Sequence, residues 1–190
     1  MRLIKVMVVV GISFFAANRL ASSQEMTRYI FRAVHSNMCM ALVPVSPGDF
    51  TQWTPNTAQA GCHGELEQAW LINRTDLVNG SPTQMRSVAS DKCLSALVSW
   101  GALTNETCDS NDDRQKWTIT VRDSSDPNSP SFTILNASTN QCVDVWYASH
   151  VAGKYLFSWE CHSGDNQSWK MFNRVWRPID SNWNAVLWQR

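Results

Sequence analysis

The sequence predicts an all-β protein made of one structural unit used three times. Three tripeptides share the pattern Q-x-W: Gln68-Ala69-Trp70, Gln115-Lys116-Trp117 and Gln167-Ser168-Trp169. A pair of cysteines precedes each of them: Cys39 and Cys62, Cys93 and Cys108, and Cys142 and Cys161. Both landmarks recur together at intervals of roughly 50 residues, which indicates a repeated supersecondary unit. Residues 117–121 and 131–135 alternate between polar and apolar side chains, as half-buried strands do.

The landmarks divide most of the chain into three units of similar length. These units are residues 26–78, 79–128 and 129–176. Clusters of turn-forming residues separate the predicted strands at 45–49, 79–82 and 123–130. Each unit has room for about four short strands, and a closed threefold arrangement of the units would leave no exposed sheet edge.

The N-terminal segment 1–23 has the layout of a secretory signal peptide. A short basic start is followed by an almost purely apolar run from Val6 to Ala17 and by small residues at 21–23. Cleavage after Ser23 or after Ala17 fits the small-residue rule. The apolar run is shorter than the roughly 20 residues that span a bilayer, so an uncleaved anchor is the less favoured alternative. We therefore expect a secreted, extracellular protein.

The C-terminal segment 177–190 contains Trp183 and Trp188 and directly follows Trp176. Two interpretations are open. The segment wraps over one end of the domain and buries its indoles, which is the usual fate of isolated aromatic side chains, or it forms an exposed docking surface.

The charge pattern argues against two classes of partner. The chain of 190 residues has a formal net charge of +0, and loss of the basic residues in 1–23 would leave it slightly acidic. It contains no basic run, so we expect neither nucleic-acid binding nor electrostatic attachment to a membrane. No segment after residue 23 is apolar enough to insert into a bilayer.

The six cysteines predict disulfides, because they follow a secretion signal. If each unit closes its own loop, the bridges are Cys39–Cys62, Cys93–Cys108 and Cys142–Cys161. Each bridge would then stabilise the fold by about 3 kcal/mol. A zinc site is the weaker alternative, because the chain has no C-x-x-C pair and His63 and His162 merely follow cysteines.

Other motifs indicate modification rather than catalysis. Five N-x-S/T triplets begin at Asn73, Asn79, Asn105, Asn136 and Asn166, of which the one at Asn79 is weaker because Pro82 follows it, and they predict a glycoprotein. The chain has no G-x-S-x-G, no H-E-x-x-H and no glycine-rich phosphate loop, and its four histidines share no motif. We expect no enzymatic activity, no cofactor and no bound metal.

Three Q-x-W tripeptides in register with three cysteine loops resemble the ricin B-type lectin family. The loops that begin Cys93-Leu94 and Cys142-Val143-Asp144-Val145 add to the likeness, which covers residues 26–176. The resemblance implies a β-trefoil with three pseudo-repeats of four strands and one disulfide within each repeat. In that family the Q-x-W tryptophan belongs to the core and its glutamine holds the local backbone. Trp70, Trp117 and Trp169 are therefore expected to be structural.

The resemblance also implies where a sugar would bind. A sugar site needs an acid and an amide for the hydroxyls and an aromatic ring for the apolar sugar face. The family places the aspartate just after the first cysteine, the ring two residues before the second, and an asparagine before the Q-x-W glutamine. The third unit has Asp144, Trp159 and Asn166 there, with Gln167 as support and Phe157 where a glutamine is frequent. Taken singly, Asp144 also fits a turn and Trp159 also fits strand packing.

The other two units lack these residues. The corresponding positions hold Ala41, Ala60 and Glu67 in the first unit and Ser95, Glu106 and Arg114 in the second. We expect neither unit to bind a simple sugar.

These observations predict a secreted lectin with one site for galactose or N-acetylgalactosamine, binding glycans of glycoproteins or glycolipids. A single shallow site has a dissociation constant near 1 mM, or about −4 kcal/mol, so useful avidity needs a homo-oligomer or clustered glycans. One alternative is a structural or protein–protein interaction subunit with a vestigial site. Another is a targeting module that associates noncovalently with a toxin or hydrolase on a second chain.

Overall fold

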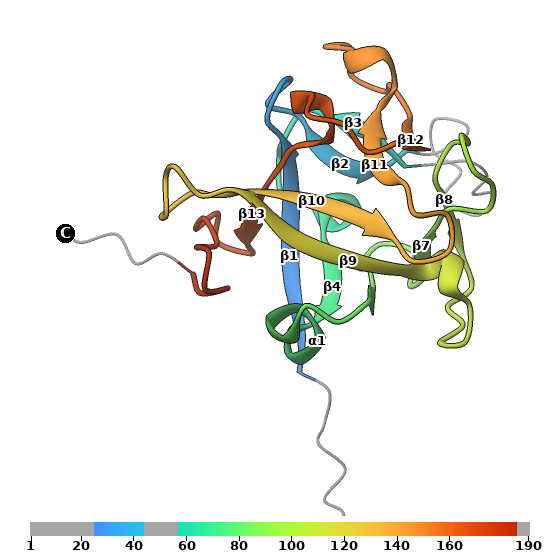
Figure 1. Ribbon diagram of the computed structural model, residues 1–190, viewed down its shortest axis with the longest axis horizontal. Helices are drawn as coiled ribbons and strands as arrows, with labels where there is room; N and C mark the ends of the chain where they lie inside the picture. The colour runs from blue at the N-terminus through green and yellow to red at the C-terminus, as the bar shows by residue number, and fades with distance from the viewer. Residues whose placement is uncertain (1–24, 44–56, 186–190) are drawn as a thin grey trace, which may run out of the picture.

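The computed structural model describes residues 25–43 and 57–185, and within these ranges the chain is all-β with a few short helices (Figure 1). The first unit contains β1 (Met26–Ala33), β2 (Cys39–Leu42), β3 (Thr57–Ala60) and β4 (Trp70–Asn73). The second contains β5 (Thr83–Gln84), β6 (Arg86–Ser87), β7 (Cys93–Ser95), β8 (Thr104–Glu106) and β9 (Lys116–Asp123). The third contains β10 (Ser131–Asn136), β11 (Cys142–Val145), β12 (Leu156–Trp159) and β13 (Trp169–Asn173). The predicted signal peptide, 1–23, lies outside the described residues.

Each unit follows the same four-strand plan, with one interruption in the second. There, the first strand is divided at Met85 into β5 and β6, which pair with different neighbours. Met85 itself is buried, and its carbonyl accepts a hydrogen bond from Leu94 N at 2.9 Å. The break at Met85 therefore lets the strand pair with β9 through β5 and with β4 through β6, while the Met85 carbonyl keeps a hydrogen-bond partner.

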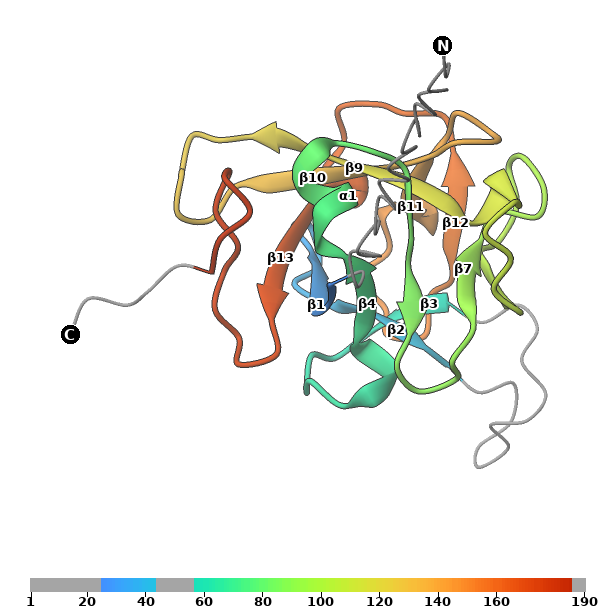
Figure 2. The same ribbon diagram turned by 90° about the horizontal axis from the view of Figure 1, so that it is seen from below.

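The strands form a ring capped by three hairpins. β1 pairs with β13 and β4, β4 with β6, β5 with β9, and β10 with both β9 and β13. Because β5 and β6 are consecutive, the ring closes, and Figure 2 shows β13, β1 and β4 side by side in it. The hairpins β2–β3, β7–β8 and β11–β12 complete the arrangement. The prediction of a β-trefoil is confirmed.

The Q-x-W tryptophans lie in the centre of the core. Trp70, Trp117 and Trp169 are each 0% exposed. The indole nitrogen of Trp117 donates to Leu94 O at 3.0 Å, and that of Trp169 donates to Val143 O at 3.2 Å. Each of these bonds ties a barrel strand to the hairpin of its own unit, whereas the indole nitrogen of Trp70 has no hydrogen-bond partner among the described residues.

The three disulfides join the cysteines of each unit as predicted, Cys39–Cys62, Cys93–Cys108 and Cys142–Cys161. Each closes the open end of one hairpin, next to the segment that leads to the Q-x-W tryptophan. The described residues contain no free cysteine.

The helices are short and follow local sequence signals. α1 (Arg74–Asn79) begins after Asn73, whose side chain accepts from Thr75 N at 2.9 Å, and ends at Gly80 with φ 66°. The 3₁₀ helices are η1 (Leu66–Gln68), η2 (Asp113–Gln115), η3 (Trp146–Ala148) and η4 (Asp165–Gln167). No helix in the described part of the chain is long and apolar enough to cross a membrane.

Residues 177–185 pack on the barrel. The Trp183 ring stacks on Phe132 with centroids 5.1 Å apart, and its carbonyl accepts from Arg74 Nη1 at 2.7 Å. Ile179 is buried, and its amide donates to Met171 O at 3.0 Å. The described part of the C-terminal segment therefore packs the Trp183 indole against the barrel. Trp188 lies outside the described residues.

Candidate functional site

The β11–β12 hairpin places Asp144 and Trp159 on one face. Antiparallel pairing sets Cys142 opposite Trp159 and Asp144 opposite Phe157. Residues directly opposite one another project to the same side of a sheet, and so do residues two apart along a strand. The acid and the indole predicted for the site therefore emerge together, beside the Cys142–Cys161 disulfide.

The Q-x-W glutamine forms the same pair of side-chain-to-backbone hydrogen bonds in all three units, and we call this pair of bonds the glutamine clip. Its side-chain NH₂ donates to the carbonyl before the second cysteine, and its side-chain oxygen accepts from the amide after it. The donor bonds reach Gly61 O (2.6 Å), Thr107 O (2.9 Å) and Glu160 O (2.8 Å), and the acceptor bonds come from His63 N, Asp109 N and His162 N (2.9 Å each). The clip fixes the cysteine segment of each hairpin, so it belongs to the fold rather than to a site.

Among the described residues, a carboxylate joins this clip in the third unit alone. Asp144 Oδ2 accepts from Gln167 Nε2 at 2.8 Å and from Asn166 Nδ2 at 2.9 Å, and His162 Nε2 lies 3.3 Å away. Asp144 is only 4% exposed. Across the described residues, no hydrogen bond reaches its other oxygen, Oδ1. One oxygen is thus held by three neighbours, and the second is available to a ligand.

Two opposing effects act on the charge of Asp144. Burial raises the pKa of its carboxyl above the ordinary value, and this effect is the larger one. Hydrogen bonds from Gln167 and Asn166, together with the neighbouring His162, lower the pKa and offset part of the shift. A buried acid that neighbours orient but do not fully compensate is typical of a ligand-binding position.

The acid lies in a cavity of ≈ 390 Å³ with aromatic walls. The lining residues are Asp144, Trp146, Tyr147, Ala148, Trp159, His162 and Asn166. The rings of Trp146 and Trp159 stand nearly perpendicular, with centroids 5.4 Å apart. The structure thus brings three of the predicted site residues, Asp144, Trp159 and Asn166, to one concave surface. Spacing within the unit did not indicate Trp146, Tyr147, Ala148 or His162, although Trp146 directly follows the Cys142–Val145 motif and His162 directly follows Cys161.

The wall formed by η3 depends on an unusual backbone. Tyr147 and Ala148 have φ angles of 56° and 48°, in the left-handed region that non-glycine residues seldom adopt. Tyr147 is 82% exposed at the rim. The first unit supports this turn from below, because Ser149 O accepts from Gln59 Nε2 at 2.7 Å and lies 3.0 Å from His35 Nε2. A strained turn anchored from a neighbouring unit is a common feature of functional sites.

The other two predicted residues do not line the cavity. Gln167 is fully buried and acts on the site through Asp144. Phe157 stacks on Trp146, with ring centroids 4.2 Å apart and planes inclined by 24°. It is not a lining residue, so its contribution is to hold the Trp146 ring in place.

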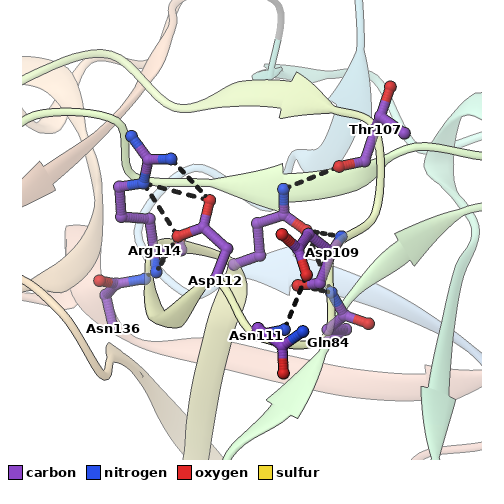
Figure 3. A network of polar contacts seen from close by, with 8 residues as sticks. Gln84, Thr107, Asp109, Asn111, Asp112, Arg114 and Asn136 are labelled. Atoms are coloured by element: carbon purple, nitrogen blue, oxygen red, sulfur yellow. Dashed lines mark hydrogen bonds and ion pairs between the residues drawn. The ribbon is translucent and has the colours of Figure 1, made fainter.

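The equivalent place in the second unit holds an ion pair at the surface. Arg114, which takes the position of Asn166, donates from Nη2 to Asp112 Oδ2 at 2.8 Å and from Nε to Asp112 Oδ1 at 2.9 Å (Figure 3). Ser95 replaces Asp144 and is buried without a hydrogen-bond partner among the described residues. In the first unit the same position is Ala41, also buried. In the described parts of the chain, no cluster of His, Cys, Asp or Glu could hold a metal ion.

Comparison with known proteins agrees with the observed fold. A family model described as "Ricin-type beta-trefoil lectin domain-like" matches residues 113–183, which include every lining residue of the cavity. The resemblance to the ricin B-type lectin family is confirmed. No curated protein matches this chain in sequence.

Solved structures with a similar fold include lectins and a module of an enzyme. The ricin B-like lectin of Macrolepiota procera in complex with lactose is 20% identical with a TM-score of 0.58, over 76% of this chain and 93% of that one. The earthworm R-type lectin C-half in complex with GalNAc is 15% identical with a TM-score of 0.56, over 76% and 97%. An exo-β-1,3-galactanase from Clostridium thermocellum is 22% identical with a TM-score of 0.63, over 77% of this chain and 30% of that one. At these identities the likeness establishes the shared fold alone.

Proposed function

We propose that the protein is a carbohydrate-binding lectin with one competent site, the cavity of the third unit. The observation that carries the proposal is the state of Asp144. Its Oδ2 is held by Asn166 and Gln167, its Oδ1 has no donor among the described residues, and the residue lines an aromatic cavity. A carboxylate oriented in this way accepts two hydroxyl groups of a sugar without rearranging.

The aromatic walls of the cavity provide contacts for the apolar face of a sugar. The C–H face of a pyranose packs against an indole, and Trp159 and Trp146 offer two such surfaces at nearly a right angle. Asn166 and His162 border the same cavity and provide further polar contacts. The volume of ≈ 390 Å³ falls within the usual range for small-ligand sites and accommodates one sugar ring.

Galactose and N-acetylgalactosamine are the sugars we propose, because similar structures are described in complex with lactose and GalNAc. We also propose secretion, since three disulfides persist in an oxidising compartment. A galactose-type glycan on a glycoprotein or glycolipid would then be the natural partner. A single open site implies weak binding, and clustered glycans or self-association would raise the avidity.

A glycan array followed by titration tests the proposal. The folded protein should bind galactose-terminated glycans, and Asp144→Asn should abolish binding while the protein stays folded, because an amide in that place still accepts from Asn166 and Gln167. Arg114→Ala in the second unit is the matched control and should leave binding unchanged. An empty array, or binding that Asp144→Asn does not affect, would refute the proposal and favour a structural or interaction subunit.

A further inference from the structure

Trp100 stands next to the candidate site but comes from the neighbouring unit. It lies in the loop between β7 and β8, and its side chain is 51% exposed. Its ring meets that of Trp159 edge to face, with centroids 4.8 Å apart and planes at 88°. The aromatic surface of the site therefore continues past Trp159 onto the second unit.

The backbone of Trp100 is strained, and a hydrogen bond from its amide to a side chain stabilises it. Its φ is 62°, in the left-handed region where a bulky residue is a genuine outlier. Its amide donates to Gln141 Oε1 at 3.1 Å, and the same oxygen accepts from Ser158 Oγ at 3.0 Å. Packing alone gives no reason to keep an exposed indole in such a backbone, so the strain suggests a role outside the fold.

The loop that carries Trp100 is joined to the strand that carries Trp159. Ser158 N donates to Gly101 O at 2.9 Å, and Leu103 N donates to Leu156 O at 2.8 Å. These bonds lie on either side of Ala102, which forms a β-bridge with Phe157. The two indoles are thus parts of one rigid surface, and their relative position does not depend on a mobile loop.

A second concavity lies on the Trp100 side. It has a volume of ≈ 310 Å³ and is lined by Trp100, Thr139, Asn140, Gln141 and Glu160. Glu160 and Asn140 are exposed, so this surface presents a carboxylate and an amide beside an aromatic ring. Acceptors, donors and an apolar face are the same three elements that the first cavity combines for a sugar.

From these contacts we infer that the concavity at Trp100 is a second subsite, which binds the sugar attached to the terminal residue held at Asp144. The inference rests on the proposed lectin function and extends it: the ligand is a glycan of at least two residues, read across the boundary of two units. Trp100 packs against the second ring, and Asn140 and Glu160 bind its hydroxyls. Among the described residues the fold supplies this subsite once, because Ala41 and Ser95 take the place of Asp144 in the other two units.

The test compares a monosaccharide with disaccharides. Methyl galactoside and a panel of galactose-terminated disaccharides of different linkage are titrated into the wild type, Trp100→Ala and the control Val98→Ala. Val98 lies in the same loop, is 61% exposed and borders neither cavity. We expect the wild type to bind at least one disaccharide about 10-fold more tightly than methyl galactoside. Trp100→Ala should remove this preference without changing the affinity for methyl galactoside, and Val98→Ala should keep both values.

A second variant separates recognition from folding. Trp100→Gly relieves the left-handed backbone, so it should unfold at a temperature equal to or above that of the wild type and still lose the disaccharide preference. Equal affinity for every disaccharide and for methyl galactoside in the wild type would overturn the subsite. So would a preference that survives both Trp100 variants. A wild type that binds no sugar at all would refute the lectin proposal itself, and the subsite with it.

Discussion

Replacing Gln167 by methionine should separate the two roles that this residue combines. Methionine has nearly the same length and volume, so the change removes hydrogen bonds without opening a cavity. Gln167 makes three such bonds, to Glu160 O, from His162 N and to Asp144 Oδ2. Gln115 in the second unit makes the same two backbone bonds and accepts one from Gln84 instead of binding an acid. Gln115→Met is therefore a matched control.

The effect on stability should be similar in both variants. Two neutral hydrogen bonds contribute about 1 kcal/mol each and the one to the carboxylate about 2 kcal/mol, so Gln167→Met should cost about 4 kcal/mol. Gln115→Met loses three neutral bonds and should cost about 3 kcal/mol. For a domain of this size either loss lowers the melting temperature by about 10 °C, which thermal unfolding followed by circular dichroism measures directly.

The effect on sugar binding should differ. The Gln167 hydrogen bond lowers the pKa of Asp144, so its removal lets that pKa rise further and leaves Oδ2 less firmly oriented. Galactoside affinity should fall about 10-fold in Gln167→Met, the equivalent of about 1.4 kcal/mol, and the pH at which binding is half lost should increase. Gln115→Met should change neither. If the two variants have the same affinity and the same pH profile, Gln167 is only a backbone clip and the reasoning fails.

Three further outcomes follow from the described contacts. Four of the five sequon asparagines are buried and use their amides in hydrogen bonds or a helix cap, so mass spectrometry of the secreted protein should find no glycan at Asn73, Asn105, Asn136 or Asn166; occupancy at any of these four would contradict the burial. Trp183→Ala removes the stack on Phe132 and should lower the free energy of unfolding by about 2 kcal/mol in denaturant titration, with sugar affinity unchanged. Gln59→Met removes a hydrogen bond to Ser149 O that supports the η3 turn and should weaken galactoside binding several-fold, whereas a merely structural Gln59 would leave it unchanged.

The fold was predictable because its landmarks are bound to the backbone. Each Q-x-W glutamine bridges the segment around a cysteine in all three units, so this residue type must recur at fixed spacing. The tryptophans recur because each fills the centre of the core, and Trp117 and Trp169 also bond to their hairpins. The division of the first strand of the second unit at Met85 has no such signature. It depends on which neighbours the strand meets once the barrel closes, which is tertiary information.

The site was predictable only where it follows the repeat. Asp144, Trp159 and Asn166 occupy positions defined by the cysteines and the Q-x-W tripeptide, and the structure brings them together. Tyr147 reaches the rim because its backbone is left-handed, and a Trp-Tyr-Ala sequence contains no residue type that predicts this conformation. Trp100 belongs to another unit, so no comparison of positions within one repeat would find it.

Asp144 is the residue at which stability and binding should respond to pH in opposite directions. Burial raises its pKa in the folded state above the unfolded value, so the favourable contribution to stability is present below the unfolded pKa and is lost as pH rises through the folded pKa. At neutral pH the buried charge therefore destabilises the fold, and Asp144→Asn should melt at a higher temperature than the wild type. The difference should disappear on acidification to below the unfolded pKa.

Sugar binding needs the charged form, so wild-type affinity should instead rise with pH over the same interval. Measuring melting temperature and galactoside affinity together across that interval tests both signs. Ala41 and Ser95 show that the other two units build the same hairpin without the acid. An acid that the hairpin does not need, and that lowers stability when charged, is best explained by the ligand it binds. If Asp144→Asn melted at a lower temperature than the wild type at pH 7, the carboxylate would instead be part of the fold, and the argument for a sugar at this position would lose its basis.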